Sequence, residues 1–349
     1  MGGMLVAFRA VLAGCGSMAR GWVKALTEQP ALMGRVDLVG LVDVHLPAAE
    51  ALQGAFGLTG VTIGTDLAAV LAATKPDLLF DVVIPAARQD VVSTGLRHGC
   101  HVLSEKPMAV SMRDAGELVA LSARTGKTHA IMQNRRYNLG VRRIRRLIDS
   151  GALGTLTAVH ADFFIGAHFG GFREQMQNVL LVDMAIHTFD AARFMSGKSP
   201  LAVYCHETNP TGSWNAHGAA ANAIFEMSDG VTFTYRGSWV AEGAPTNWDS
   251  AWRIIGTKGT LLWDGADQFD ARTLASDQGF LRPLEPLDVP PPEDAGQTLG
   301  HASVIAAFLS ALEAGHAAET VGHDNIKSLA MVFAAIESAA SRTRMEITP

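Results

Sequence analysis

Two short stretches carry side chains suited to acid–base chemistry, Glu105-Lys106-Pro107 and Asp183-Met184-Ala185-Ile186-His187. The second lies in a helical pattern, so its i, i+4 spacing places Asp183 and His187 on one helix face, where the carboxylate can orient or charge the imidazole. Such a pair can remove a hydroxyl proton, and a lysine at a strand end can stabilise alkoxide charge. Taken alone, these residues also fit a surface lysine and a capping or salt-bridge arrangement. Because the sequence has no HExxH motif and no cysteine cluster, we expect no metal site.

A glycine-rich turn indicates where a ligand could bind. Gly14-x-Gly16-x-x-Ala19 directly follows the apolar residues 8–13 and opens a helical pattern. The first glycine permits a tight turn, the second lets the backbone approach a pyrophosphate, and the small alanine allows close packing of helix and sheet. On its own this motif is a weak signal. The strand before it and the helix after it favour a dinucleotide site.

Asp43 stands at the end of the second expected strand, residues 36–42. A carboxylate there can accept hydrogen bonds from both ribose hydroxyls of NAD and would repel the 2′-phosphate of NADP. The alternative is a turn residue at a strand end, and the complete strand–helix–strand unit favours the cofactor. We therefore expect NAD rather than NADP, and the absence of GxxxxGK[ST] disfavours a P-loop ATPase.

Six strand patterns alternate with helical patterns in the first part of the chain. The strands are expected at residues 8–13, 36–42, 61–63, 78–84, 101–104 and 128–133. This alternation predicts an α/β domain with a Rossmann-type, doubly wound parallel sheet. In open sheets of this kind, ligands bind at the carboxyl ends of the strands. Lys106 follows the fifth strand and should therefore lie at that edge.

The pattern changes after residue 133. Further helices are expected at residues 139–149, 179–195, 304–313 and 324–341. Alternating strands between residues 155 and 274 predict a large, mainly antiparallel sheet, and the proline-rich residues 283–292 predict a surface connection. We therefore expect a dinucleotide-binding domain over residues 1–133 and a substrate-binding and oligomerisation domain over residues 134–349. The terminal helix of the second could pack back on the first.

Taken together, these features resemble the Gfo/Idh/MocA family, which includes glucose–fructose oxidoreductase and inositol dehydrogenase. The resemblance rests on GCGSMA after the first strand, Asp43, the stretch GCHVLSEKP at residues 99–107 and Asp183-x-x-x-His187. It extends over essentially the whole chain and implies a Rossmann domain followed by an α/β domain with an open antiparallel sheet. It also implies oxidation or reduction of one carbinol of a sugar, cyclitol or related polyol with NAD(P), catalysed by Lys106, Asp183 and His187.

Two sets of binding residues are expected. The cofactor set is Gly14, Gly16, Ser17, Met18, Ala19, Asp43, Pro85, Glu105 and Lys106. The substrate set is Lys106, Arg136, Tyr137, Asn138, Asp183, His187, Trp239 and Asn247. Trp248 and Trp252 could also line a sugar site because pyranose C–H faces stack on indoles, although sheet packing is the plainer role for each tryptophan. Many family members carry glycines where this chain has Gln177-Asn178-Val179, so no single member's substrate can be transferred to it.

Composition excludes several other classes of protein. The 349 residues carry 18% charged side chains and a net charge of -6, which point away from disorder and give no general attraction to nucleic acid or anionic lipid. Three cysteines, none in a CxxC, indicate a reducing cytoplasm. No apolar run reaches the roughly 18 residues of a membrane helix. Leu12-Ala13-Gly14-Cys15 is similar to a lipoprotein cleavage site, but the first four residues carry no basic side chain and Arg9 interrupts the apolar stretch.

Two other functions also fit the sequence. One is a glycosidase that transiently oxidises a sugar carbon with tightly held NAD, so that the aglycone leaves by elimination. The other is a non-catalytic dinucleotide sensor, which would usually lack the lysine or the histidine that are present here. The polar candidates favour a neutral or mildly acidic polyhydroxylated substrate. The family resemblance further implies a homodimer or homotetramer that pairs through the open sheet faces.

Overall fold

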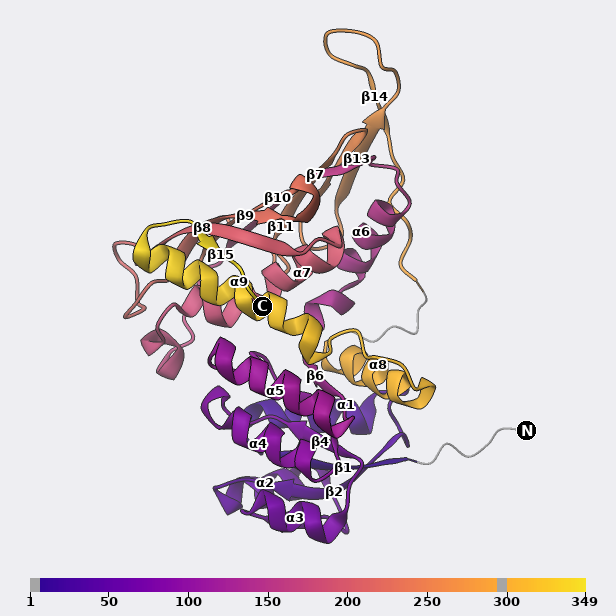
Figure 1. Ribbon diagram of the computed structural model, residues 1–349, viewed down its shortest axis with the longest axis vertical. Coiled ribbons are helices and arrows are strands. Elements are labelled where there is room, and N and C mark those ends of the chain that lie inside the picture. The colour runs from indigo at the N-terminus through magenta and orange to yellow at the C-terminus, as the bar shows by residue number, and fades with distance from the viewer. Residues whose placement is uncertain (1–6, 294–299) are drawn as a thin grey trace, which may run out of the picture. The chain divides into compact units, whose positions relative to one another are not determined.

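The computed structural model describes residues 7–293 and 300–349. The chain forms two compact units (Figure 1). The first comprises Met1–Asn134 and Gly296–Ile326, and the second comprises Arg135–Ala295 and Lys327–Pro349. The chain thus passes from one unit to the other near the point where the sequence pattern changes. Residues 300–326, which the sequence analysis grouped with the second domain, belong to the first unit.

A six-stranded parallel sheet forms the centre of the first unit, in the order β3-β2-β1-β4-β5-β6. Its strands are β1 (Phe8–Ala13), β2 (Val36–Val42), β3 (Thr62–Gly64), β4 (Leu78–Asp81), β5 (His101–Ser104) and β6 (His129–Ile131). The expected doubly wound parallel sheet is confirmed. Strand order reverses between β1 and β4, and such a switch point is where open α/β sheets bind ligands.

Local sequence signals set the ends of the helices around this sheet. The helices are α1 (Ser17–Glu28), α2 (Leu46–Phe56), α3 (Leu67–Thr74), α4 (Pro85–Arg97), α5 (Met112–Thr125) and α8 (His301–Ala314). Asp66 Oδ1 accepts a hydrogen bond from Ala69 N, and Ser111 Oγ accepts one from Asp114 N, each at 3.1 Å. These contacts are the N-caps of α3 and α5. Helix α4 begins at Pro85, because proline is favoured at the first helical position.

The second unit contains a nine-stranded sheet in the order β14-β13-β12-β11-β7-β10-β9-β8-β15. Its strands are β7 (Leu156–Phe164), β8 (Pro200–Thr208), β9 (Ala220–Met227), β10 (Thr232–Ser238), β11 (Ala251–Gly256), β12 (Gly259–Trp263), β13 (Phe269–Leu274), β14 (Leu284–Pro286) and β15 (Met345–Glu346). Only β7 and β10 pair in parallel, so the expected mainly antiparallel sheet is confirmed.

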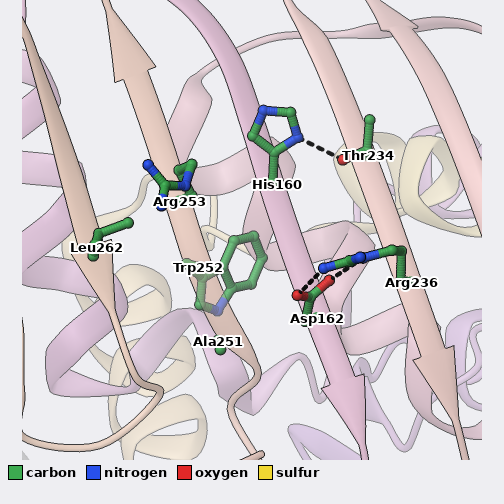
Figure 2. A pocket seen from close by; sticks show the side chains of 8 residues that line it. All are labelled: His160, Asp162, Thr234, Arg236, Ala251, Trp252, Arg253 and Leu262. Carbon is green, nitrogen blue, oxygen red and sulfur yellow. Dashed lines mark hydrogen bonds and ion pairs between the residues drawn. The ribbon is translucent and has the colours of Figure 1, made fainter.

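One face of this sheet is covered and the other is open. Helices α6 (Leu139–Asp149) and α7 (Ile186–Ser196) lie on the covered face, together with much of α9 (Gly322–Ser341) (Figure 1). Residues along β9 are buried and exposed in turn, as expected when side chains alternate between a packed and an open face. On the open face, Figure 2 shows a pocket whose walls include His160 and Arg253 of neighbouring strands and the Asp162–Arg236 ion pair.

The proline-rich residues 283–292 contain a strand that the sequence analysis missed. Leu284–Pro286 forms β14, which pairs antiparallel with β13 at the sheet edge. An edge strand tolerates proline because one row of its backbone groups is not needed for pairing. Farther along, the carbonyl of Pro290 accepts a hydrogen bond from Arg143 Nε of α6 at 2.7 Å. Arg143 of α6 therefore holds this segment in place.

Candidate functional site

The turn after β1 forms a cradle suited to a phosphate group. Gly14 has a φ of 89°, and a Cβ there would lie 2.6 Å from the carbonyl carbon of Val82, so only glycine fits. At Gly16 a Cβ would meet nothing within 4 Å, which leaves open space in front of the turn. Gly16 is also the N-cap of α1 and supplies no side-chain cap. The first amides of α1 are therefore available to an anion, which is the fit a dinucleotide pyrophosphate requires.

The remaining expected cofactor residues lie around this turn or at neighbouring strand ends. Ser17, Met18 and Ala19 form the first turn of α1, and Pro85 begins α4. Asp43 follows β2, where its Oδ2 accepts from Cys15 N at 2.7 Å and its Oδ1 accepts from His45 N at 2.8 Å. These bonds fix the carboxylate beside the glycine turn. Each oxygen keeps a further lone pair that a ribose hydroxyl can use.

Glu105 supports the loop that carries Lys106 from inside the first unit. It is only 8% exposed, and its Oε1 accepts from Trp22 Nε1 at 2.8 Å and from His301 Nε2 at 2.9 Å. Burial raises the pKa of Glu105, but the hydrogen bonds from His301 and Trp22 and the charge of Lys106 outweigh burial, so the net shift is downward. Its Oε2 also accepts from Lys106 N at 3.3 Å. Glu105, expected among the cofactor residues, thus stays ionised and holds the loop.

A second buried polar chain reaches the same loop. His129 Nε2 lies 3.0 Å from Ser104 Oγ, and Ser104 in turn hydrogen-bonds to Asp81. Arg88 Nε donates to Asp81 Oδ2 at 2.8 Å, and Arg88 Nη1 donates to the carbonyl of Pro107. Burial raises the pKa of Asp81, while the neighbouring guanidinium opposes that shift. The strand ends of β4 and β5 therefore anchor the residue that follows Lys106, a role that sequence reasoning missed.

The second unit presents Asp183 and His187 on consecutive helical turns. Leu180–Ala185 forms a π-helical turn that leads directly into α7. The sequence predicted one helix over residues 179–195, and the wider turn replaces its first part. Single π turns are frequent at functional sites. His187 is 9% exposed and lines a pocket whose other walls include Met184, Trp248, Asp249 and Trp252.

The structure adds Arg173, which sequence reasoning did not single out. Its Nε donates to Asp183 Oδ2 at 3.2 Å. Its guanidinium also lies 5.3 Å from the ring centroid of Phe169 and 5.1 Å from that of Phe172. Cation–π stacking of this kind restrains an arginine side chain. A charged residue directly after the second of two phenylalanines in a glycine-rich loop is the signal that could have identified it.

Arg136 and Tyr137, expected to contact substrate, take part in packing within the second unit. Arg136 is 4% exposed, and its Nε and Nη2 donate to the two oxygens of Asp190 at 2.6 and 2.7 Å. The ring of Tyr137 lies 4.5 Å from the guanidinium of Arg142. A buried bidentate pair of this kind fixes the 3-10 turn Asn134–Tyr137, which precedes α6, against α7.

Asn138 and Asn247 also make structural contacts. Asn138 is the N-cap of α6, where its Oδ1 accepts from Gly140 N at 2.8 Å and its Nδ2 donates to Asp249 Oδ2 at 2.6 Å. Asn247 Nδ2 donates to the carbonyl of Asp264 at 2.9 Å. Both asparagines therefore fix loops beside the pocket that His187 lines. Asparagine before a helical pattern is a typical capping signal, so the first contact could have been foreseen.

The tryptophans divide into packed and exposed members. Trp239 is 3% exposed and packs edge-on against Phe163 and Phe169, with ring centroids 5.0 and 5.2 Å away. Trp252 is also buried, as the packing role predicts. Trp248 is 47% exposed, lies 5.8 Å from Trp239 and borders the pocket that His187 lines. Trp248 is therefore the most exposed of these three indoles.

Within residues 7–293 and 300–349, no three His, Cys, Asp or Glu side chains gather as a metal ion would require. No helix in that part of the chain is both long enough and apolar enough to cross a membrane.

Comparison with known proteins gives matches for both units. Residues 8–133 match the model of the oxidoreductase family with an NAD-binding Rossmann fold, and residues 141–262 match that of the GFO/IDH/MocA C-terminal domain. D-apiose dehydrogenase of Paraburkholderia graminis is 24% identical over 348 residues, which cover 97% of this chain and 90% of that protein. Inositol 2-dehydrogenase of Rhizobium meliloti is 24% identical over 343 residues, or 91% of this chain and 94% of that one.

A solved structure extends the likeness to the fold. An oxidoreductase from Agrobacterium radiobacter, in complex with NAD+, L-tartaric acid and magnesium, is similar with a TM-score of 0.84 and 20% sequence identity. The match covers 97% of this chain and 98% of that one. Nearly the whole chain therefore shares the fold of that oxidoreductase.

Proposed function

Because the chain belongs to the Gfo/Idh/MocA family of NAD-binding oxidoreductases, we propose that it oxidises one carbinol of a sugar, glycoside or cyclitol with NAD. The observation that carries this proposal is the complete reactive set, Lys106 with Asp183 and His187, in a chain whose two units both match the family. The names of the relatives, D-apiose dehydrogenase and inositol 2-dehydrogenase, support this substrate class.

Each reactive residue has a distinct role in the proposed reaction. His187 removes the proton from the substrate hydroxyl, and Asp183 orients the imidazole and stabilises its positive charge. Lys106 donates a hydrogen bond to the same oxygen as negative charge develops there. The glycine turn and Asp43 would hold the dinucleotide by its pyrophosphate and ribose. When bound, NAD supplies the carbon that accepts the hydride.

Assembly is a further part of the proposal. One row of side chains crosses the open face of the nine-stranded sheet and consists of Tyr204, Ile224, Thr234, His160, Arg253 and Leu262. Tyr204 and Ile224 are 49% and 53% exposed, and the Asp162–Arg236 pair beside this row is charge-neutral (Figure 2). The two exposed apolar side chains, Tyr204 and Ile224, support a second copy of the chain on this face. The three cysteines are free and buried, which supports the expected cytoplasmic location.

An NAD-reduction screen over sugars, glycosides, cyclitols and sugar acids tests the reaction. With the best substrate, Lys106→Ala, Asp183→Ala and His187→Ala are each expected to lower turnover at least a hundredfold, and the Asp183 and His187 variants are expected to leave NAD affinity unchanged. Lys24→Ala, on the exposed face of α1, is the control. Full activity in the Lys106 and His187 variants would contradict the assignment. Release of an aglycone without net NADH formation would identify the glycosidase instead.

A further inference from the structure

We propose that the first unit carries a second ligand site, for a small hydroxylated carboxylate, in a pocket at the amino end of β6. The glycine cradle, in contrast, follows the carboxyl end of β1. The pocket is lined by the end of α5, the start of β6 and the start of α9, and its volume is about 410 Å³. That volume lies in the range of small-molecule sites. The pocket contains none of the residues assigned to the cofactor or to the reaction.

The polar lining of the pocket favours one negative charge. Lys127 lies at its wall, and within the described part of the chain this lysine forms no ion pair. Its backbone is fixed to α5, because Ser122 Oγ donates to the Lys127 carbonyl at 2.5 Å. His323 and Gly322 open α9, where the first helical amides lack intrahelical acceptors. A single ammonium beside a helix start suits a carboxylate, whereas a phosphate dianion usually requires further arginine or lysine.

A buried histidine in the pocket wall provides an independent sign of a ligand. His129 is 1% exposed, and burial together with the Arg88 charge lowers its pKa to about 3, so the ring is neutral. Because the Ser104 hydroxyl donates to Asp81, it accepts from His129 Nε2–H. The Nδ1 of His129 is then an acceptor, and no donor reaches it from the described residues. A hydroxyl group on the ligand would satisfy it.

Gly322 lies against this unsatisfied nitrogen. A Cβ at that position would be 3.5 Å from His129 Nδ1, in ordinary van der Waals contact, so a larger side chain there would crowd the ring. The pocket thus combines a cation, a helix start and a hydrogen-bond acceptor, which together match a carboxylate that also bears hydroxyls. His129 is also the first member of the polar chain that ends at the Pro107 carbonyl. A ligand here would therefore contact the network that supports the lysine loop.

Calorimetric titration of the full-length chain with D-gluconate tests the site. We expect the wild type to bind gluconate and Lys127→Ser to bind it at least tenfold more weakly. Gly322→Val should also bind gluconate more weakly, because the larger side chain blocks His129. Lys24→Ser is the matched control, and Lys106→Ala separates this site from the proposed catalytic one; both should bind gluconate as the wild type does. Gluconate binding that is equal in wild type, Lys127→Ser and Gly322→Val would overturn the proposal.

Two further probes define the ligand class. D-glucitol, which has the hydroxyls but no carboxylate, should bind at least tenfold more weakly than D-gluconate. Inorganic phosphate should also bind more weakly than D-gluconate. If phosphate bound more tightly than D-gluconate and Lys127→Ser abolished that binding, the carboxylate assignment would be overturned. In protein with 15N-labelled histidine, gluconate should move the Nδ1 resonance of His129, identified by its loss in His129→Gln. An unmoved resonance would remove His129 from the site. Because these binding measurements require no turnover, their outcome does not depend on the proposed reaction.

Discussion

Asp43 is the residue that we expect to set cofactor preference. Its carboxylate is fixed by the amides of Cys15 and His45 and would repel a 2′-phosphate. By fluorescence titration, the wild type should bind NADH at least tenfold more tightly than NADPH. Asp43→Asn removes the charge but keeps the side-chain shape, so it should narrow this difference. Equal affinity for the two cofactors in the wild type would contradict the prediction.

Glu105 links the stability of the first unit to pH. Its pKa in the folded protein lies below the ordinary value of 4.5, so the folded state binds this proton less readily than the unfolded chain. The stabilisation from the ionised side chain is therefore complete above that ordinary value and is lost as the pH falls toward the folded pKa. Hydrogen bonds to a buried charged group contribute about 1.5–3 kcal/mol.

Glu105→Gln tests this linkage. We expect its free energy of unfolding in urea to be about 1.5–3 kcal/mol below that of the wild type at about pH 7, and this gap to narrow as the pH falls below the ordinary pKa of 4.5. Glu28→Gln, which changes an exposed carboxylate on α1, should show no such gap at either pH. A gap for Glu105→Gln that is independent of pH would mean that the hydrogen-bond geometry matters and the charge does not.

At the scale of elements, strong local signals made it possible to predict the strands and helices that position the candidate site residues. Strand β1, strand β5 and helix α6 have the bounds expected from the sequence. Apolar runs between turn residues define buried parallel strands, and the 3.6-residue period with an asparagine cap defines α6. Because parallel strands share one carboxyl edge, the edge positions of the glycine turn, Asp43 and Lys106 followed directly from the strand assignments.

Elements that depend on distant contacts could not be predicted in this way. An α turn and a π turn show the same apolar pattern, so the widened turn at Leu180–Ala185 left no local signal. Glu105 and His301 are 196 residues apart, and their contact exists only because α8 returns to the first unit. Arg173 and Asp183 meet across an irregular loop for which the sequence predicts no geometry. In each case tertiary packing, rather than periodicity, decides the contact.

At the scale of the whole molecule, the open sheet face determines the assembly that we expect. A stable dimer usually buries about 800 Å² on each partner, and the exposed row through Ile224 runs across strands β8 to β12 of the sheet. Light scattering of the wild type at micromolar concentration should therefore give a multiple of the 37.0 kDa chain mass. Ile224→Lys would place an unpaired charge in the interface and should release monomers. Leu281→Lys, at an exposed position outside the strands, should leave the assembly intact. A measured mass of 37.0 kDa for the wild type would refute assembly under these conditions. If the Ile224→Lys variant remained oligomeric, the interface would have to lie on another face of the molecule.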